Sequence, residues 1–275
     1  MFFCPKGFRA PELSHFVEFG LHKAGAGLET YDMKIVAVIP ARLGSTRLPR
    51  KPLREILGKP MIQRVYEAAH ASGLENVVVA TDSSEIQELG KRLGMRVEMT
   101  SAECQSGTDR VREIARKIDA DVYMNVQGDE PLARPEHIQA LVALMQRGDE
   151  VKVGTLKTPC PTPDVHNPNS VKVVTDHDGR ALYFSRATVP HDRDFAGDVK
   201  YFKHLGFYAY RRRTLEAFPT LPASALERIE RLEQLRFLEN GISVYVAETP
   251  FDTIGVDTEE DVKRVEDVLR RDRRT

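Results

Sequence analysis

Apolar and polar positions follow two patterns in the first half of this chain of 275 residues. Short continuous apolar runs bounded by polar turns are typical of buried parallel strands, and apolar residues at helical spacing are typical of amphipathic helices. The two patterns alternate, which predicts an α/β fold with a mostly parallel central sheet. Expected strands are 34–39, 76–81, 96–99 and 121–126, and expected helices are 60–71, 84–93, 111–118 and 135–146.

The second half has a different pattern. We expect an antiparallel excursion over about residues 150–212, which serves dimerisation or sugar binding, before the α/β alternation returns. Its strands are expected at 153–156, 170–175, 181–185 and 203–210, followed by helix 225–240, strand 242–247 and helix 259–270. We interpret the apolar stripe of helix 225–240 as a core face. This stripe is Leu226, Ile229, Leu232, Leu235 and Leu238.

The first residues lack either pattern. Residues 1–32 show no regular period, and they lack the apolar core and cleavage site of a signal peptide. We interpret them as a disordered or non-native leader, with Met33 as the effective start of a domain that spans 33–275. The alternative is a short surface helix at about 11–23.

Composition excludes several classes of protein. Lys plus Arg (40) nearly balance Asp plus Glu (41), so a broad basic face for nucleic acid is not expected. No apolar stretch approaches the ~18 residues of a membrane span. The cysteines Cys4, Cys104 and Cys160 are odd in number and far apart, which predicts neither a disulfide scaffold nor a zinc site and fits a reducing cytoplasm.

A basic loop follows the first strand. Its cations stand among Gly44 and Ser45, and such a loop offers backbone N–H groups and side-chain cations to a polyphosphate. They are Arg42, Arg47, Arg50 and Lys51. Walker A spacing is absent, and Gly25-x-Gly27 follows no strand, so neither of those phosphate motifs applies. The alternative interpretation is a solvated basic turn.

Two aspartates are candidate metal ligands. Asp129 follows the strand expected at 121–126, at the same sheet edge as the basic loop, and Asp257 precedes a capping box of Thr258 and Asp261. Carboxylates together with substrate phosphates suit Mg²⁺. The alternatives are an ordinary turn aspartate and an Asp257 that itself caps the last helix.

Other polar groups stand at a helix start or inside apolar elements. Ser106, Gly107 and Thr108 open a helix whose N–H groups suit a phosphate or a base edge, although a plain cap explains them too. A second set would suit a hydroxyl-rich, carboxylated small molecule, although each member alone could be an ordinary surface or core group. This set is Arg186, His204, Tyr208, Glu230, Glu233 and Gln234.

From Met33 to the last helix, the chain resembles the bacterial 3-deoxy-manno-octulosonate (Kdo) cytidylyltransferases. The resemblance rests on a set of motifs in the right order, and the full set is far more specific than any member. The matches include Ile-Pro-Ala-Arg-Leu-Gly-Ser-Thr-Arg-Leu-Pro (39–49), Gln-Ser-Gly-Thr-Asp-Arg (105–110), Asn-Val-Gln-Gly-Asp-Glu-Pro (125–131), Asn-Pro-Asn-Ser-Val-Lys-Val-Val (167–174), Lys-His-Leu-Gly-Phe-Tyr-Ala-Tyr-Arg (203–211) and Gly-Val-Asp-Thr (255–258).

The resemblance implies a Rossmann-like nucleotidyltransferase, usually a homodimer, that transfers CMP from CTP to Kdo for lipopolysaccharide synthesis. It implies that Arg42, Arg47 and Lys51 hold the triphosphate and that Asp129 and Asp257 hold Mg²⁺. It places cytosine near Ala41, Arg42 and the loop of Ser106, Gly107 and Thr108. It places the sugar against Gln127, Arg186, His204, Tyr208, Glu230, Glu233 and Gln234, and it assigns Arg42, Lys51, Asp129 and Asp257 to catalysis.

Two alternatives and one departure stay open at this point. The acceptor could be a related acidic sugar, such as the 8-amino analogue of Kdo, or the fold could serve a non-catalytic nucleotide sensor. The departure is Arg50, where the family usually has Gly. We expect Arg50 to have a negative φ and to point its guanidinium outward.

Overall fold

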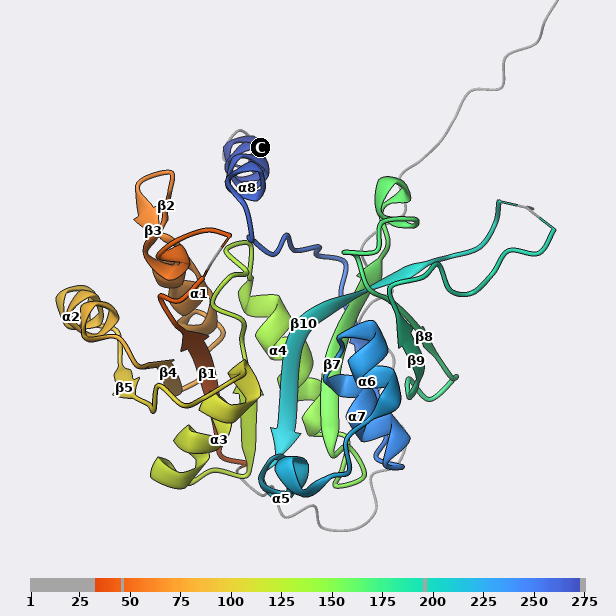
Figure 1. Ribbon diagram of the computed structural model, residues 1–275, viewed down its shortest axis with the longest axis horizontal. Coiled ribbons are helices and arrows are strands. Elements are labelled where there is room, and N and C mark those ends of the chain that lie inside the picture. The colour runs from red at the N-terminus through yellow and green to blue at the C-terminus, as the bar shows by residue number, and fades with distance from the viewer. Residues whose placement is uncertain (1–32, 46, 195–196, 273–275) are drawn as a thin grey trace, which may run out of the picture. The chain divides into compact units, whose positions relative to one another are not determined.

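A twisted central sheet organises the computed structural model, which describes residues 33–45, 47–194 and 197–272 (Figure 1). The leader expected at 1–32 lies outside these residues. The sheet order is β11-β7-β10-β6-β1-β4-β5, and only β10 runs antiparallel to its neighbours along this path. The strands are β1 (Ile35–Ala41), β4 (Asn76–Thr81), β5 (Val97–Met99), β6 (Val122–Asn125), β7 (Val153–Pro159), β10 (Phe202–Arg211) and β11 (Val244–Glu248).

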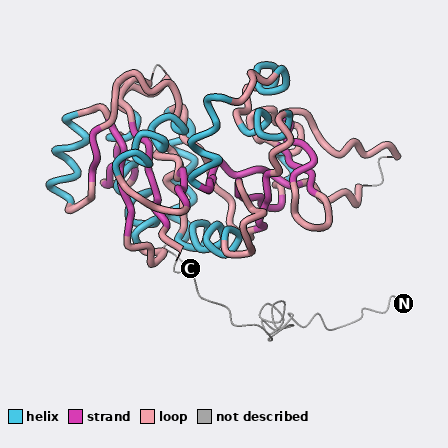
Figure 2. Tube along the Cα trace, turned by 90° about the horizontal axis from the view of Figure 1, so that it is seen from below, coloured by secondary structure: helices cyan, strands magenta, loops and turns pink. Residues whose placement is uncertain are grey.

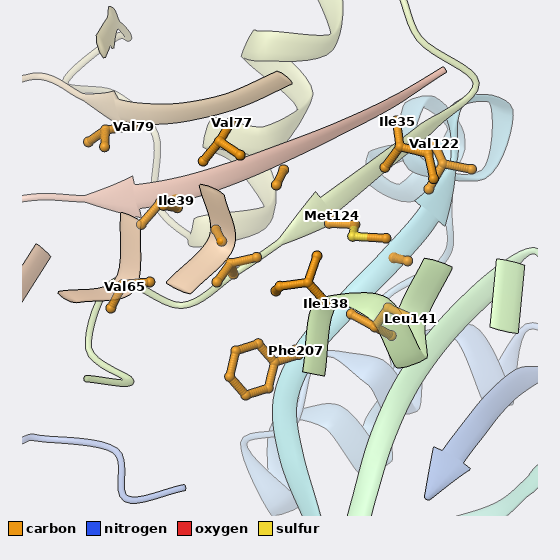
Figure 3. Packing of buried hydrophobic residues seen from close by; sticks show 14 of the residues in the cluster. Ile35, Ile39, Val65, Val77, Val79, Val122, Met124, Ile138, Leu141 and Phe207 are labelled. Carbon is orange, nitrogen blue, oxygen red and sulfur yellow. The ribbon is translucent and has the colours of Figure 1, made fainter. Parts of the chain in front are cut away.

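Helices cover both faces of the sheet (Figure 2). One face packs on α1 (Met61–His70), α2 (Ser84–Leu93) and α4 (Pro135–Met145). The other packs on α3 (Gly107–Lys117), α5 (Arg212–Ala217) and α7 (Gln234–Glu239). Because side chains alternate along a strand, β1 sends Ile35 and Ile39 into the first core and Val36 and Val38 into the second. Figure 3 shows the first core, in which Phe207 lies near Ile138 and Leu141 of α4.

A third apolar cluster holds the last helix, α8 (Glu259–Asp272), against the hairpin of β2 (Glu55–Ile56) and β3 (Lys59–Pro60). Ile56 and Met61 contribute from the hairpin side, and Val256, Val262 and Val265 from the side of α8. The 3-10 turn η2 (Lys51–Leu53) directly precedes this hairpin. The cluster therefore fixes the segment before α8 relative to the basic loop.

The expected α/β class with a mostly parallel sheet is confirmed, and most element boundaries agree within two residues. Helix α3 starts four residues earlier than expected, because Ser106 and Asp109 form a capping box there. Of the expected excursion, β7 and β10 lie inside the central sheet, and only the hairpin of β8 (Lys172–Thr175) and β9 (Ala181–Ser185) branches off β10. The pattern did not predict the short elements α5, β2, β3, η2, η3 (Thr162–Asp164) and η4 (Phe218–Thr220).

The single helix expected over 225–240 is wrong. It is broken into α6 (Ala225–Glu230) and α7 by Arg231, which has φ 56° in the left-handed region. Ile229 is 78% exposed, so the apolar stripe is not a continuous core face. The break accompanies polar contacts of Glu230 with β9, which a straight apolar-faced helix would not require.

Gly90 of α2 offers a stability test, because an added Cβ there would overlap a methyl group of Val97 on β5. Helix propensity alone favours Gly90→Ala by about 1 kcal/mol, but forcing a methyl group into a packed contact costs about 1–3 kcal/mol. We expect Gly90→Ala to lower the free energy of unfolding in urea. Val97→Ala removes the overlapping methyl group, so Gly90→Ala should destabilise the Val97→Ala protein less than it destabilises the wild type. A Gly90→Ala protein more stable than the wild type would contradict this packing.

Candidate functional site

Two polar cavities open at the edge of the sheet where the parallel strands end. Strands β1, β4, β6 and β7 finish at this edge, and the antiparallel β10 begins there. The chain leaves β1 toward β4 and later returns to its other side as β6, so this is the switch point at which open α/β sheets bind ligands.

The first cavity has a volume of about 380 Å³ and lies over the ends of β1 and β6. Its floor is tight: a Cβ on Gly128 would lie 2.6 Å from the carbonyl oxygen of Pro40, so only glycine lets the two loops approach. The residues expected at the nucleotide and metal sites gather here. Those that line it are Ala41, Arg42, Arg47, Lys51, Ser106, Gly107, Asp129 and Asp257, together with Gln127.

Lys51 joins the two candidate metal ligands. Its Nζ donates to Oδ2 of Asp129 at 2.6 Å and to Oδ1 of Asp257 at 3.0 Å. Arg47 Nη2 lies 2.9 Å from the other oxygen of Asp257. Burial alone would lower the pKa of the Lys51 ammonium, but Asp129 and Asp257 together raise it, so Lys51 is a cation here. Carboxylates from two distant segments thus converge on one positive atom.

The cap of α8 explains why Asp257 is available. The Thr258 hydroxyl accepts from the backbone N–H of Asp261, and the carboxylate of Asp261 accepts from the backbone N–H groups of Asp257 and Thr258. Thr258 and Asp261 therefore close the helix start, and Asp257 turns its side chain to Lys51 instead. The alternative in which Asp257 itself caps the helix is wrong.

Arg50 departs from its expected backbone conformation. Its φ is +57°, so the negative φ expected from the sequence is wrong. The guanidinium does point away from the cavity, and it pairs with Glu85 at the start of α2. A left-handed conformation costs a non-glycine residue roughly 1–2 kcal/mol, which explains why glycine suits this position.

The loop at the start of α3 is held by a buried arginine that the sequence patterns did not single out. Arg110 is 2% exposed and donates to the carboxylate of Asp82 at 2.8 Å and to the hydroxyl of Thr100. Both Arg110 and Ser106 line the first cavity, whereas the hydroxyl of Thr108 is buried and donates to Glu233 at 2.8 Å. Arg110 does stand inside the 105–110 motif, which was the available signal.

The second cavity, of about 580 Å³, meets the first at Arg47 and Asp257, which line both. Its wall includes the start of β10 and the loop before β8. Arg186 and His204 line it as expected for the sugar, and Lys203, Glu130 and Asn169 line it without having been predicted. Lys203 is tied to Asp252 Oδ1 at 2.9 Å and to the carbonyl of Thr253 at 2.8 Å.

Electrostatics differ sharply among these wall residues. Burial lowers the pKa of His204 to about 3, and its Nε2 lies 2.9 Å from the hydroxyl of Thr155, so the ring is neutral at pH 7. Burial and the adjacent charge of Asp129 raise the pKa of Glu130 to about 8. The cavity thus combines a neutral imidazole and a carboxyl group of raised pKa with the cation of Lys203.

Other residues expected at the sugar do not line the second cavity. Glu230 accepts from the Ser185 hydroxyl at 2.7 Å and from the N–H of Arg186 at 2.9 Å. The ring of Tyr208 stacks on Tyr210 and is tilted against His204. Glu233 accepts from the hydroxyl of Thr108 in α3, whereas Gln127 lines the first cavity. Gln234 is buried. The roles given to all these residues stay predictions.

The described residues contain no helix that is long and apolar enough to cross a membrane. They also contain no cluster of three or more histidine, cysteine or acidic side chains that could hold a metal alone. A divalent ion held by Asp129 and Asp257 would therefore take its other oxygen ligands from water or from a substrate.

The fold and the basic loop after its first strand are those of a nucleotidyltransferase. A profile of the cytidylyltransferase family matches residues 36–248, so the chain belongs to this family. A 3-deoxy-manno-octulosonate cytidylyltransferase of Koribacter versatilis is 63% identical over 92% of this chain and 96% of its own. A 3-deoxy-manno-octulosonate cytidylyltransferase of Acidobacterium capsulatum is 58% identical over 86% of this chain and 97% of its own.

A solved structure supports the same relationship. It is a CMP:2-keto-3-deoxy-manno-octonic acid synthetase complexed with CTP, to which this chain is 42% identical with a TM-score of 0.82. The match covers 87% of this chain and 99% of that chain. The expected Rossmann-like nucleotidyltransferase fold is thereby confirmed.

Neighbouring cations of the basic loop should differ in their effect on activity. Lys51→Ala removes a charge that lines the first cavity, and we expect it to lower kcat/KM by more than about tenfold. Arg50→Gly removes a side chain that points to Glu85, and we expect it to change KM for CTP by less than about threefold. Initial rates of both variants decide this, and equal damage would place Arg50 in the site.

His204 should make the stability of the protein depend on pH. Its folded pKa of about 3 lies below the unfolded value, so as the pH falls below about 6.5 the unfolded chain takes up a proton that the folded chain refuses. At pH 5.5 this costs about 1 kcal/mol relative to pH 7.5. Urea unfolding should show that the wild type loses this amount of stability relative to His204→Gln when the pH is lowered from 7.5 to 5.5. A difference that does not change with pH would contradict the neutral imidazole.

Proposed function

We propose that the chain transfers CMP from CTP to Kdo, giving CMP-Kdo and pyrophosphate. The observation that carries this proposal is the junction of two polar cavities at Asp257 and Arg47, beside Lys51 and Asp129. One cavity offers cations and a helix start to a triphosphate, and the other offers hydrogen-bonding groups to an acidic sugar. The relatives' names and the CTP complex of the similar structure support the same reaction.

The chain's own residues would act by positioning and by neutralising charge. With CTP in the first cavity, the anomeric hydroxyl of the sugar attacks the α-phosphorus in line as the bond to the β-phosphate breaks. Lys51, Arg47 and Arg42 would hold the triphosphate and compensate the charge of the leaving pyrophosphate. The Ser106–Asp109 capping box keeps the N-terminal N–H groups of α3 at the edge of the same cavity.

We propose that Asp129 and Asp257 hold Mg²⁺. Two hard carboxylates that converge on one cationic atom fit a divalent ion that completes its coordination with phosphate oxygens. The ion would polarise the phosphate and lower the pKa of the sugar hydroxyl. With the ion bound, Lys51 would be free to turn its ammonium to the phosphates.

We also propose that the protein acts as a homodimer in the cytoplasm, on small molecules and not on nucleic acid. The expectation of a dimer rests on the resemblance to the Kdo cytidylyltransferases, which are usually homodimers. Support for a small-molecule role comes from the near balance of acidic and basic residues.

Release of pyrophosphate from CTP tests the function, with Kdo, its 8-amino analogue and a neutral sugar as acceptors. We expect activity with Kdo, and we expect Asp129→Asn and Asp257→Asn each to lower kcat/KM at least about 100-fold, the scale of a lost Lewis acid. Glu259→Gln is the matched control, because this exposed carboxylate lies near Asp257 but pairs with Arg54 and lines neither cavity.

The Glu259→Gln variant should keep wild-type rates. Wild-type turnover in either aspartate variant at saturating Mg²⁺ would rule out the two-carboxylate metal site. No pyrophosphate release with any acidic sugar would rule out the function itself.

A further inference from the structure

Lys172 is a charged residue in the interior of the protein that the proposed reaction does not use. It begins β8, is fully buried and stands between Ser185 of β9 and Lys203 of β10 in the strand register. Its Nζ donates to the backbone carbonyls of Asn167 at 2.8 Å and of Ser170 at 2.6 Å. Removing an ammonium from water is costly, so a neutral side chain would be the cheaper filling for this space.

The carbonyls that Lys172 binds belong to the loop 167–170 (Asn167 to Ser170). A second cation, Arg186, donates from Nη1 to the carbonyl of Pro168 at 3.0 Å. Three of the four carbonyls in loop 167–170 are thus held by buried or half-buried cations. Within the loop, the N–H of Asn169 donates to the side-chain oxygen of Asn167 at 3.0 Å. The N–H of Ser170 donates to the backbone carbonyl of Asn167 at 3.1 Å.

Loop 167–170 forms part of the wall of the second cavity. Asn167, Asn169 and Ser170 line this cavity, and the carbonyls of Asn167 and Ser170 are directed to Lys172, which does not line it. Hydrogen bonds from a charged donor are stronger than those from a neutral one. A polar loop that is fixed before the ligand arrives binds it without the cost of ordering.

We propose that Lys172 is a positioning residue for the acidic sugar, which acts by holding loop 167–170 in the shape that presents its polar side chains to the second cavity. This rests on the proposed function of that cavity as the acceptor site. Lys172 does not touch the sugar, so its loss should weaken sugar binding more than nucleotide binding or the chemical step.

Lys172→Met keeps the length and apolar stem of the side chain and removes the ammonium. We expect KM for Kdo to rise at least about tenfold, with KM for CTP changed less than about twofold. The matched control is Lys157→Met, because Lys157 is a half-buried lysine on β7 that binds Thr175 and lines neither cavity of the site. It should leave both constants unchanged. A lower melting temperature of Lys172→Met with both KM values unchanged would overturn the proposal.

Hydrogen exchange of the peptide that spans 164–171 gives a readout independent of activity. The N–H groups of Asn167, Asn169 and Ser170 are hydrogen-bonded, and they should exchange faster in Lys172→Met than in the wild type or in Lys157→Met. Unchanged exchange would overturn the role of Lys172 even in an active enzyme. Absence of wild-type pyrophosphate release, in contrast, would refute only the function on which the sugar assignment rests.

Pro168→Gly decides the matter if Lys172→Met does not fold. Pro168 is exposed and its side chain is not part of the cavity wall, so the change loosens loop 167–170 but keeps every cation and cavity side chain. A proline-to-glycine change gives the backbone of the loop more conformations to lose on ordering. We expect a rise of roughly two- to fivefold in KM for Kdo alone. An unchanged KM for Kdo would show that the order of the loop does not govern sugar binding.

Discussion

The contact of Lys51 with Asp129 and Asp257 is the interaction on which the candidate site depends. It joins three segments: the loop after β1, the loop after β6 and the connection that enters α8. Two carboxylates this close would repel one another without a cation between them. The apolar cluster of Ile56, Val256 and Val262 brings these segments together, and Lys51 makes their charges compatible. Apolar packing and charge pairing therefore both hold Asp129 and Asp257 close to Lys51.

Local sequence predicted the parts of the fold that obey a single period. Strand β4 and helix α2 agree residue by residue with the expectation. The apolar run of β4 is buried on both faces of the sheet, α2 has one buried face, and the two elements have clear ends at Thr81 and Gly94. The site residues at strand ends were equally predictable, since parallel strands bring their carboxyl ends to one edge. Asp129 and the basic loop meet there for this reason, although 78 residues separate Lys51 from Asp129.

Sequence reasoning failed where a long-range polar contact overrides the local pattern. The apolar spacing over 225–240 predicts one helix, but Arg231 takes a left-handed conformation, and the pieces on either side carry Glu230 to β9 and Glu233 to α3. Arg50 likewise keeps a positive φ despite its Cβ. Its strain is roughly 1–2 kcal/mol, and the guanidinium pairs with Glu85 of α2. No spacing rule contains the positions of these partners.

Two kinds of cation near the cavities differ in what they bind. Arg110 and Lys172 are buried and bind protein oxygens, so they shape the loops that border the two cavities. Arg42 and Arg47 line the first cavity and are exposed, so their guanidinium groups are accessible to an anion that enters it. A chain with net charge −1 can therefore bind a polyanion, because the placement of a few cations, and not the overall charge, sets the field inside the cleft. The buried cations hold the loops on the other sides of the two cavities, because a charged donor fixes its acceptor more firmly than a neutral donor could.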